Sequence, residues 1–242
     1  LCTGILTGTP ISGQSRLTSV AKSPLTGCIG DAQGGGYFPA EMKFSGFDAV
    51  IIKGRSPKPV YLWLHHGEAE LRDASHLWGL TTGDAEDKLK EELDDKRIEV
   101  LQIGPAGENL VRFSALISMS NRANGRTGMG AVMGSKNLKA VVVRGKMKPA
   151  IANPEKFKEI QKLARVNLEP TGMDGFGKYG TPGVTTPQHR AGGLPTYNFN
   201  SGNFDKHEEI DGHKLYNEHL RGHEKDDQNR FGRDTCFSCS IK

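Results

Sequence analysis

The chain has 242 residues, of which 36% are hydrophobic and 25% are charged, a composition typical of a soluble globular protein with one large domain or one domain and part of another. No apolar run approaches the roughly 18 residues that a helix needs to span a bilayer, which argues against an integral membrane protein. The net charge is +4, and acids and bases are interleaved, so no nucleic-acid-binding surface stands out.

The first 145 residues are rich in predicted strands. Residues 47–53, "FDAVIIK", are an apolar run closed by Gly54 and predict a buried strand. Residues 82–96 predict an amphipathic helix with an acidic first turn and apolar residues at helical spacing. The remaining predicted strands are 59–66, the expected hairpin partner of 47–53, then 68–74, 98–104, 110–118 and 138–145.

The character of the chain changes after residue 150, where we place a domain boundary. Asn153 is a candidate N-cap and Pro154 a first helical residue, so a helix is predicted to about residue 168. Residues 171–205 are rich in Gly, Pro, Thr and Asn and are expected to be loop-like, and a short helix is expected over 212–221.

One internal repeat stands out. Residues 37–54, "YFPAEMKFSGFDAVIIKG", align without a gap with residues 128–145, "GMGAVMGSKNLKAVVVRG". A glycine cluster precedes each copy, "QGGG" in the first case and "NGRTG" in the second. Each copy therefore predicts a Gly-rich loop, a short helix, a strand and a glycine. The similarity is either chance or a duplicated unit that presents two equivalent loops.

Gly-rich loops beside helix starts favour anionic groups, because their backbone N–H groups can approach a ligand closely. Arg16, Arg122 and Arg126 lie beside these loops, and arginine offers a planar set of donors suited to phosphate. The alternative is that each arginine is a solvated surface residue. Two such loops suit a ligand with two anionic ends, or two ligands.

Four cysteines in the chain are too few for a disulfide scaffold, which favours reduced thiols in the cytoplasm. Cys236 and Cys239 form a C-x-x-C pair in "TCFSCSIK". By itself the pair is a redox dithiol, half of a zinc site, or the first two ligands of an iron–sulfur cluster. A zinc site completed by two histidines from the second half of the chain matches no standard finger spacing.

Several segments, in order along the chain, resemble one family. They are "GILTGT" (4–9), "AKSPLTG" (21–27), "GGYFPAEMKFSGFDAVIIKG" (35–54), "KPVYLWLHHGEAELRDASHLWG" (58–79), "IGPAGENLVRF" (103–113), "RANGRTGMGAVMGSKNLKA" (122–140) and the C-x-x-C pair. Together they resemble the aldehyde ferredoxin oxidoreductase family of tungsten–pterin enzymes, over essentially the whole chain and most strongly over residues 1–145.

The resemblance implies an α+β fold. Residues 1–150 would be a pterin-binding N-terminal domain of two similar β-sheet units with short helices, and residues 151–242 would begin a mainly helical domain. The implied activity is oxidation of aldehydes to carboxylic acids at tungsten, or molybdenum, held by two pterins. A [4Fe–4S] cluster would pass the electrons to ferredoxin or a similar acceptor, in an anaerobic, cytoplasmic setting, with a homodimer left open.

The resemblance also assigns site residues. Arg16 matches an arginine between pterin and cluster, where its charge would stabilise negative charge on both. Backbone carbonyl groups of Gln33 and Ala123 would hold a magnesium ion that bridges the pterin phosphates, and Thr127 replaces a usual glycine. Pterin contact is implied for Gln33, Gly35, Arg122, Ala123, Gly125 and Arg126.

Cys236 and Cys239 match the first two ligands of the [4Fe–4S] cluster, whose further ligands would follow residue 242. The residues proposed for acid–base chemistry also lie downstream in the family, so no catalytic residue is named, and we expect the 242-residue piece alone, lacking its first strands and helical cover, to be inactive. Two alternatives remain: the same fold acting on an aromatic acyl-CoA or another carbonyl compound, or a non-catalytic metal-binding module.

Overall fold

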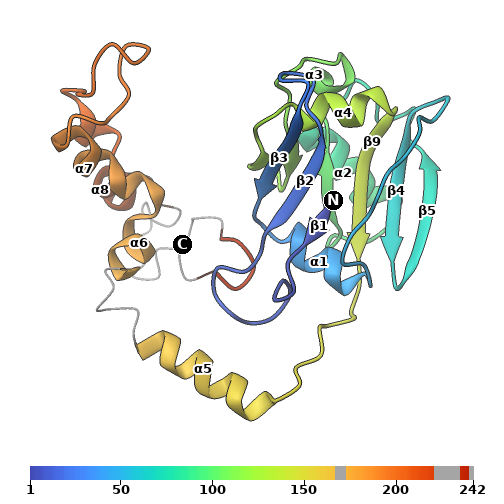
Figure 1. Ribbon diagram of the computed structural model, residues 1–242, viewed down its shortest axis with the longest axis horizontal. Helices are drawn as coiled ribbons and strands as arrows, with labels where there is room; N and C mark the ends of the chain where they lie inside the picture. Colours follow the sequence, from blue (N-terminus) through green and yellow to red (C-terminus); the bar gives the residue numbers. More distant parts are fainter. Residues whose placement is uncertain (167–172, 221–234, 240–242) are drawn as a thin grey trace. The chain divides into compact units, whose positions relative to one another are not determined.

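The computed structural model describes residues 1–166, 173–220 and 235–239 (Figure 1). They belong to two compact units, Leu1–Ala150 with Cys236–Ser238, and Ile151–Thr235 with Cys239–Lys242. The predicted α+β fold is confirmed, since the first unit holds two β-sheets and the described part of the second is built from helices. Within the described ranges, no helix has the length and apolar character to cross a membrane.

The larger sheet of the first unit has six strands in the order β5-β4-β9-β6-β7-β8. Its central strand, β9, runs parallel to β4 and antiparallel to β6. Almost every residue of β9 is buried, because both faces of this sheet are covered. The bounds are β4 Val60–His65, β5 Glu68–Asp73, β6 Glu99–Gln102, β7 Leu116–Ser118, β8 Arg122–Asn124 and β9 Leu138–Arg144.

The smaller sheet has three antiparallel strands, β1 (Cys2–Thr3), β2 (Leu17–Lys22) and β3 (Ile29–Gly34). Helices α1 (Phe38–Phe44) and α4 (Met129–Ser135) each contact both sheets. Their buried residues form one core with alternate residues of β9: Phe38, Met42, Met129, Met133, Val141 and Val143.

Two further helices complete the first unit. Helix α2 (Thr82–Glu92) covers the opposite face of the larger sheet, where Leu89 packs in a second core with Val142. The short helix α3 (Pro105–Glu108) contacts α4. The Thr81 hydroxyl accepts the Asp84 amide and so begins α2, which ends four residues before the predicted residue 96.

The structure supports the predicted duplication. In the second copy, β6, β7, β8 and α4 lead to β9, and in the first copy β1, β2, β3 and α1 lead to residues 48–50. The pairing is equivalent: β6 lies antiparallel to β9, and Cys2 forms an antiparallel bridge with Ala49. Each copy therefore places one loop, after β3 or after β8, directly before a helix.

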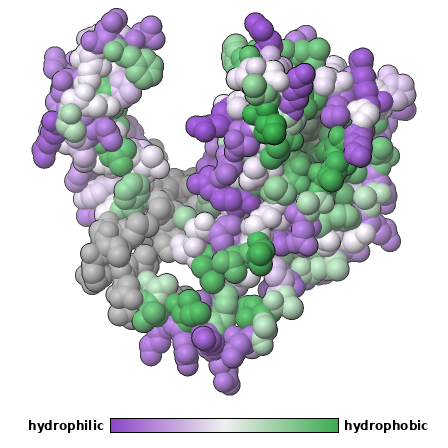
Figure 2. Space-filling model, viewed as in Figure 1, coloured by the Kyte–Doolittle hydropathy of each residue, from purple (hydrophilic) through white to green (hydrophobic). Residues whose placement is uncertain are grey.

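The strand predicted over 47–53 is wrong. Only Ala49 is bridged, and the Val50 amide donates to the Leu1 carbonyl oxygen (2.8 Å). The short β1 covers one edge of this segment, and within the described residues no strand covers the other edge. An apolar cavity of about 310 Å³ borders the segment, and hydrophobic side chains gather on this part of the first unit (Figure 2). A β-branched run becomes a strand only where another strand pairs with it.

Most of the other strands predicted for the first unit are confirmed. The strands at 59–66, 68–74, 98–104 and 138–145 are confirmed as β4, β5, β6 and β9, with the hairpin formed by β4 and β5 instead of 47–53 and 59–66. The strand predicted over 110–118 shrinks to β7, because Leu110 has φ 58° and the chain turns there. Strands β1, β2, β3 and β8 have no counterpart among the predicted strands.

The second unit begins with α5 (Pro154–Val166), whose predicted cap is confirmed: the Asn153 side chain accepts the Lys156 amide (2.9 Å). The predicted helix end at 167–168 lies outside the described residues. Residues 212–219 form the predicted short helix, as α8 (Gly212–Lys214) and the π-helical η4 (Leu215–His219).

The loop predicted over 171–205 is wrong in part. It contains α6 (Met173–Tyr179), the 3₁₀ helix η2 (Thr181–Val184) and α7 (Thr185–Arg190). Its prolines suggested loops, but Pro182 and Pro187 lie in the first turns of η2 and α7. Proline is tolerated at these positions, because the first turn of a helix leaves its N–H groups unpaired. A further 3₁₀ turn, η3, spans His207–Glu209.

Candidate functional site

The first Gly-rich loop continues directly from β3 into α1. Gln33 is exposed at the end of β3 and pairs with Thr18 of β2. Gly34 must lack a side chain, because a Cβ there would lie 2.4 Å from the Asn124 Oδ1 atom of the second loop. The two loops therefore lie against each other, which the sequence could not show.

The second Gly-rich loop joins β8 to α4. Its anchor is the buried Asn124, whose Nδ2 lies 2.8 Å from the Ala32 carbonyl oxygen and 3.0 Å from the Ser19 hydroxyl. Thr127, at φ 61°, places its hydroxyl 3.0 Å from the Asp31 carbonyl oxygen. These contacts hold the second loop against β2 and β3 of the first copy.

A polar cavity of about 540 Å³ lies where the two loops meet. It brings together three of the predicted site residues, Gln33, Gly125 and Arg126, and adds Asp31. Within the described residues the Arg126 guanidinium makes no hydrogen bond or ion pair, so its charge is available to an anion. Asp31 lines the same cavity, and a carboxylate there suits a site that takes a cation together with an anion.

The other predicted loop residues lie close in the chain to this cavity. Arg122 and Ala123 belong to β8, and the Arg122 guanidinium donates to the Asn121 side chain (3.0 Å). Arg16 precedes β2, whose Leu17 pairs with Gly34. Arg16 is exposed, and within the described residues its side chain has no hydrogen bond or ion pair. The register thus places Arg16 beside the first loop.

Cys236 also lies at the first loop. A Cβ on Gly35 would come within 2.7 Å of the Cys236 Sγ atom, so the sulfur sits directly over the glycine backbone. The next residue, Phe237, donates its amide N–H to the Gly36 carbonyl oxygen (3.1 Å). The structure therefore brings Cys236 to Gly35, two residues beyond the cavity residue Gln33. Cys239 is counted with the second unit.

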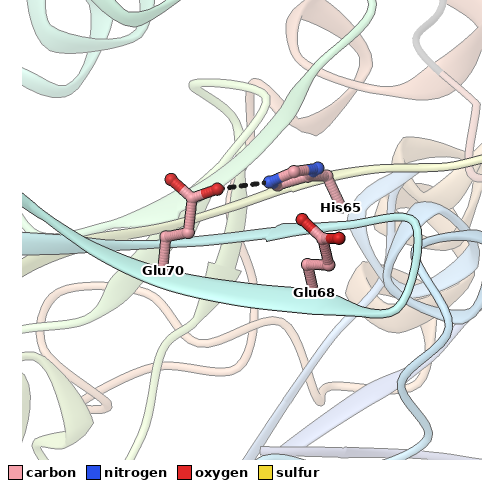
Figure 3. Close-up of side chains that lie close together, drawn as sticks. All are labelled: His65, Glu68 and Glu70. Carbon is pink, nitrogen blue, oxygen red and sulfur yellow. Dashed lines mark hydrogen bonds and ion pairs between the residues drawn. The ribbon is translucent and has the colours of Figure 1, made fainter.

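A separate charged cluster lies on the β4–β5 hairpin (Figure 3). Potential ligand atoms of His65, Glu68 and Glu70 all lie within 4.8 Å of one another. Glu70 bonds the His65 ring (2.9 Å) and the Arg72 guanidinium (2.8 Å), and these bonds lower the pKa of its carboxyl. Since Arg72 already neutralises Glu70, the cluster is explained as a surface ion-pair group without a metal.

Three residues of this region were missed by sequence reasoning. Asp31 lines the cavity, Asn124 joins the two copies, and Phe237 contacts the first loop. The dipeptide Asn124–Gly125 indicates a turn, but no sequence signal shows that its asparagine is buried. Phe237 is a spacer residue within the C-x-x-C pair, and its contacts are visible only in three dimensions.

Two family models match the chain. Residues 1–145 match "Aldehyde ferredoxin oxidoreductase, N-terminal domain", and residues 156–242 match "Aldehyde ferredoxin oxidoreductase, domains 2 & 3". The tungsten-containing aldehyde ferredoxin oxidoreductases of Pyrococcus abyssi and Pyrococcus horikoshii are 43% and 42% identical over 99% of the chain. The chain spans 38% of the length of these relatives.

Relatives with other substrates also match. The WOR-like subunit of an aliphatic sulfonate oxidoreductase from Pyrococcus furiosus is 36% identical over 73% of the chain and 30% of its own length. A solved structure, the active-site complex BamBC of benzoyl coenzyme A reductase in complex with 1,5-dienoyl-CoA, aligns with a TM-score of 0.67. It is 37% identical and covers 69% of this chain and 26% of that one.

Proposed function

Because the chain belongs to the aldehyde ferredoxin oxidoreductase family, we propose that it is part of an oxidoreductase that converts aldehydes into carboxylic acids. The proposal includes a tungsten ion, or molybdenum, held by two pterins, a [4Fe–4S] cluster and ferredoxin as the electron acceptor. The bound metal would supply the two-electron redox chemistry, and a cluster held by Cys236 and Cys239 would supply the route for the electrons. The protein supplies binding, orientation and electrostatics.

The placement of Cys236 over Gly35 is the observation that carries this proposal. A thiol that ligates a cluster and a loop that binds a pterin must be neighbours if electrons are to pass between the groups. The chain meets this condition through residues far apart in sequence. The C-x-x-C pair supplies thiolate ligands of the kind that iron–sulfur clusters require.

The loops fit phosphate-bearing cofactors. Arg126 lines a polar cavity, and its guanidinium has no partner among the residues that the structure describes. Guanidinium groups bind phosphate through paired hydrogen bonds. Asp31 in the same cavity would repel a phosphate unless a cation lay between them, which supports the magnesium ion proposed at the Gln33 and Ala123 carbonyl oxygens. We assign Arg16, Gln33, Gly35, Arg122, Ala123, Gly125 and Arg126 to the cofactor and Cys236 and Cys239 to the cluster.

The proposal assigns residues 1–150 to the pterin-binding domain and 151–242 to the beginning of the helical domain. The four cysteines are free thiols, which supports a reducing cytoplasm as the setting. The anaerobic setting is proposed from the family alone. A homodimer stays a prediction.

A second function is favoured by the solved neighbour. The benzoyl coenzyme A reductase complex has 37% sequence identity to this chain, so the same fold can serve the reduction of an aromatic acyl-CoA. The two functions would share the loops and Cys236, and they would differ in the residues that line the substrate pocket.

The test uses the full-length protein purified without oxygen. We expect tungsten or molybdenum together with iron, and reduction of the cluster by aldehydes. Absence of tungsten and molybdenum would overturn the proposal, and activity with an aromatic acyl-CoA but not with aldehydes would select the second function. Arg126→Ala should lower the bound metal and pterin severalfold, whereas the exposed Arg55→Ala, as a matched control, should leave both unchanged.

A further inference from the structure

We infer that Phe237 is a positioning residue, which holds Cys236 against the first Gly-rich loop so that the cluster forms at a fixed place beside the pterin site. The inference rests on the proposed function for its consequence. The docking of Phe237 itself rests on contacts within the first unit, and it can be tested separately.

The backbone contact comes first. The Phe237 amide donates to the Gly36 carbonyl oxygen (3.1 Å), which also accepts the Ser15 hydroxyl (2.7 Å). Gly36 has φ 97°, and a Cβ there would lie 2.9 Å from the Met119 sulfur. Only glycine therefore presents this carbonyl group in this place without strain.

The aromatic ring of Phe237 makes the second contact. It meets the Tyr37 ring edge-on, with 6.0 Å between centroids at 83°, and the Phe44 ring at 5.7 Å and 78°. Both distances and angles match the favoured edge-to-face geometry of aromatic pairs. Tyr37 is the N-cap of α1 and Phe44 is its last residue. The Phe237 ring therefore packs against the helix that directly follows Gly35 and Gly36.

These contacts act on Cys236 because it is the adjacent residue. Its sulfur lies over Gly35, and Ser238 on the other side of Phe237 has φ 54°, an unfavourable value for a residue with a side chain. The turn is therefore held by the docked phenyl ring and not by its own backbone preference. A metal ligand must be held within about half an ångström of its productive place, which a free turn does not provide.

The size of the effect follows from the two aromatic pairs. Each pair of this geometry stabilises the docked position of the Phe237 ring. Losing both pairs should raise the fraction of molecules in which residue 237 is undocked roughly 5- to 150-fold. We therefore expect Phe237→Ala to expose the Cys236 thiol in the metal-free protein.

The experiment measures the alkylation rates of individual cysteines by iodoacetamide in metal-free full-length protein, with peptide mass spectrometry as the readout. In Phe237→Ala the rate at Cys236 should rise about tenfold relative to the exposed Cys28 of the same unit. Tyr37→Ala, which removes one of the two aromatic partners, should give a smaller rise. Tyr37→Phe keeps the ring and should match the unmodified protein.

Unchanged Cys236 alkylation in both Phe237→Ala and Tyr37→Ala would overturn the inference, as would an equal rise at Cys28 and Cys236, which reports general unfolding. If Phe237→Ala fails to fold by circular dichroism, Tyr37→Ala decides. In holoprotein, Tyr37→Ala should also change the electron paramagnetic resonance spectrum of the reduced cluster, and an unchanged spectrum would contradict the positioning role. Absence of the cofactors from the full-length protein would overturn the proposed function. The alkylation rates would still test the docking of Phe237.

Discussion

The two copies of the duplicated unit share a sequence pattern but not an environment. In the second copy, "LKAVVVR" forms β9, paired on both sides, and Val142 is fully buried. In the first copy, the aligned residue Ile51 is 84% exposed and lies outside any strand. The comparison shows that a β-branched run specifies the capacity to pair, and that the neighbouring strands decide whether a strand forms.

The same contrast holds for the charged residues that precede these runs. Lys139 of the second copy is buried, forms an ion pair with Glu108 and donates to the Leu80 carbonyl oxygen (3.0 Å). Its aligned counterpart, Asp48, is exposed and pairs with Lys43 at the surface. One copy thus carries its charge inside the protein, and the other carries it in water.

The largest expected effect comes from breaking the buried ion pair. Glu108→Ala leaves the Lys139 ammonium buried without its partner and should destabilise the first unit by about 3–5 kcal/mol. It also removes the acceptor of the Gly79 amide (2.8 Å). Hydrogen exchange of β9 peptides in the full-length protein measures this change. Asp48→Ala is the matched control, with an expected loss below about 1 kcal/mol; similar losses in the two variants would contradict the contrast.

The next effect concerns β6, the antiparallel neighbour of β9. Burial, together with the charges of Glu86 and Glu41, raises the pKa of Glu99 on β6 to about 7. Between pH 4.5 and 7 the folded protein binds more protons at this carboxyl than the unfolded chain does, so stability falls as the pH rises. The corresponding strand β1 carries no such group.

Glu99→Gln should therefore stabilise the first unit by about 3 kcal/mol at pH 8 and by little at pH 4.5. Denaturant titrations at the two pH values, with hydrogen exchange of β9 peptides as the readout, measure the change in the free energy of unfolding and its sign. The same substitution at an exposed position of β5, Glu68→Gln, is the matched control. A gain in Glu99→Gln that is equal at both pH values would refute the assignment.

Truncation of the aligned aliphatic residues tests the first contrast directly. Val142→Ala creates a cavity in a closely packed core and should cost about 2 kcal/mol. Ile51→Ala removes an exposed side chain and should change stability by less than about 0.5 kcal/mol. Thermal unfolding of the two variants gives the comparison, and a cost for Ile51→Ala as large as that for Val142→Ala would show that residues 48–53 are covered in the full-length protein.

The smallest effect is expected at the loops, where Thr127 aligns with Gly36. Both residues have positive φ, 61° and 97°. Thr127→Gly relieves the strain of a β-branched residue, about 1–2 kcal/mol, but it loses the hydroxyl contact to Asp31, about 1 kcal/mol, and gains unfolded-state freedom. The net change should stay within about 1 kcal/mol by thermal unfolding. A loss of several kcal/mol would mean that the hydroxyl contact dominates.

Much of the fold could be predicted from the sequence where local pattern and pairing agree. Alternation predicted β4, the acidic first turn and apolar spacing predicted α2, and the Asn153–Pro154 signal predicted the start of α5. The strand predicted over residues 47–53 was wrong because strand formation depends on partner strands that no local pattern shows. The helices η2 and α7 between 181 and 190 were missed because prolines in first turns look like loop signals. Helix α6 was missed because Gly175 and Gly177 lie inside it, and glycine is unfavourable in a helix interior.

The candidate site was predicted as two loops and a cysteine pair, but not as one place. Repetition and glycine content identified the loops, and the resemblance named residues such as Gln33 and Arg126, whose roles stay predictions. What joins them is tertiary contact: Asn124 spans the two copies, and Cys236 reaches Gly35 from the far end of the chain. Such contacts depend on the whole fold, so they carry no signal in any short segment.

Cys236–Ser238 leave the ribosome long after the surface that receives them. The other residues of the first unit end at Ala150, and at 5–20 residues per second the intervening segment of about 85 residues takes roughly 4–17 s to synthesise. N-terminal domains generally fold first during synthesis, so Gly35, Gly36 and the rings of Tyr37 and Phe44 are in place before Phe237 exists. If the first loop binds a cofactor as we propose, that interval would leave the loop open to it before Cys236 covers Gly35.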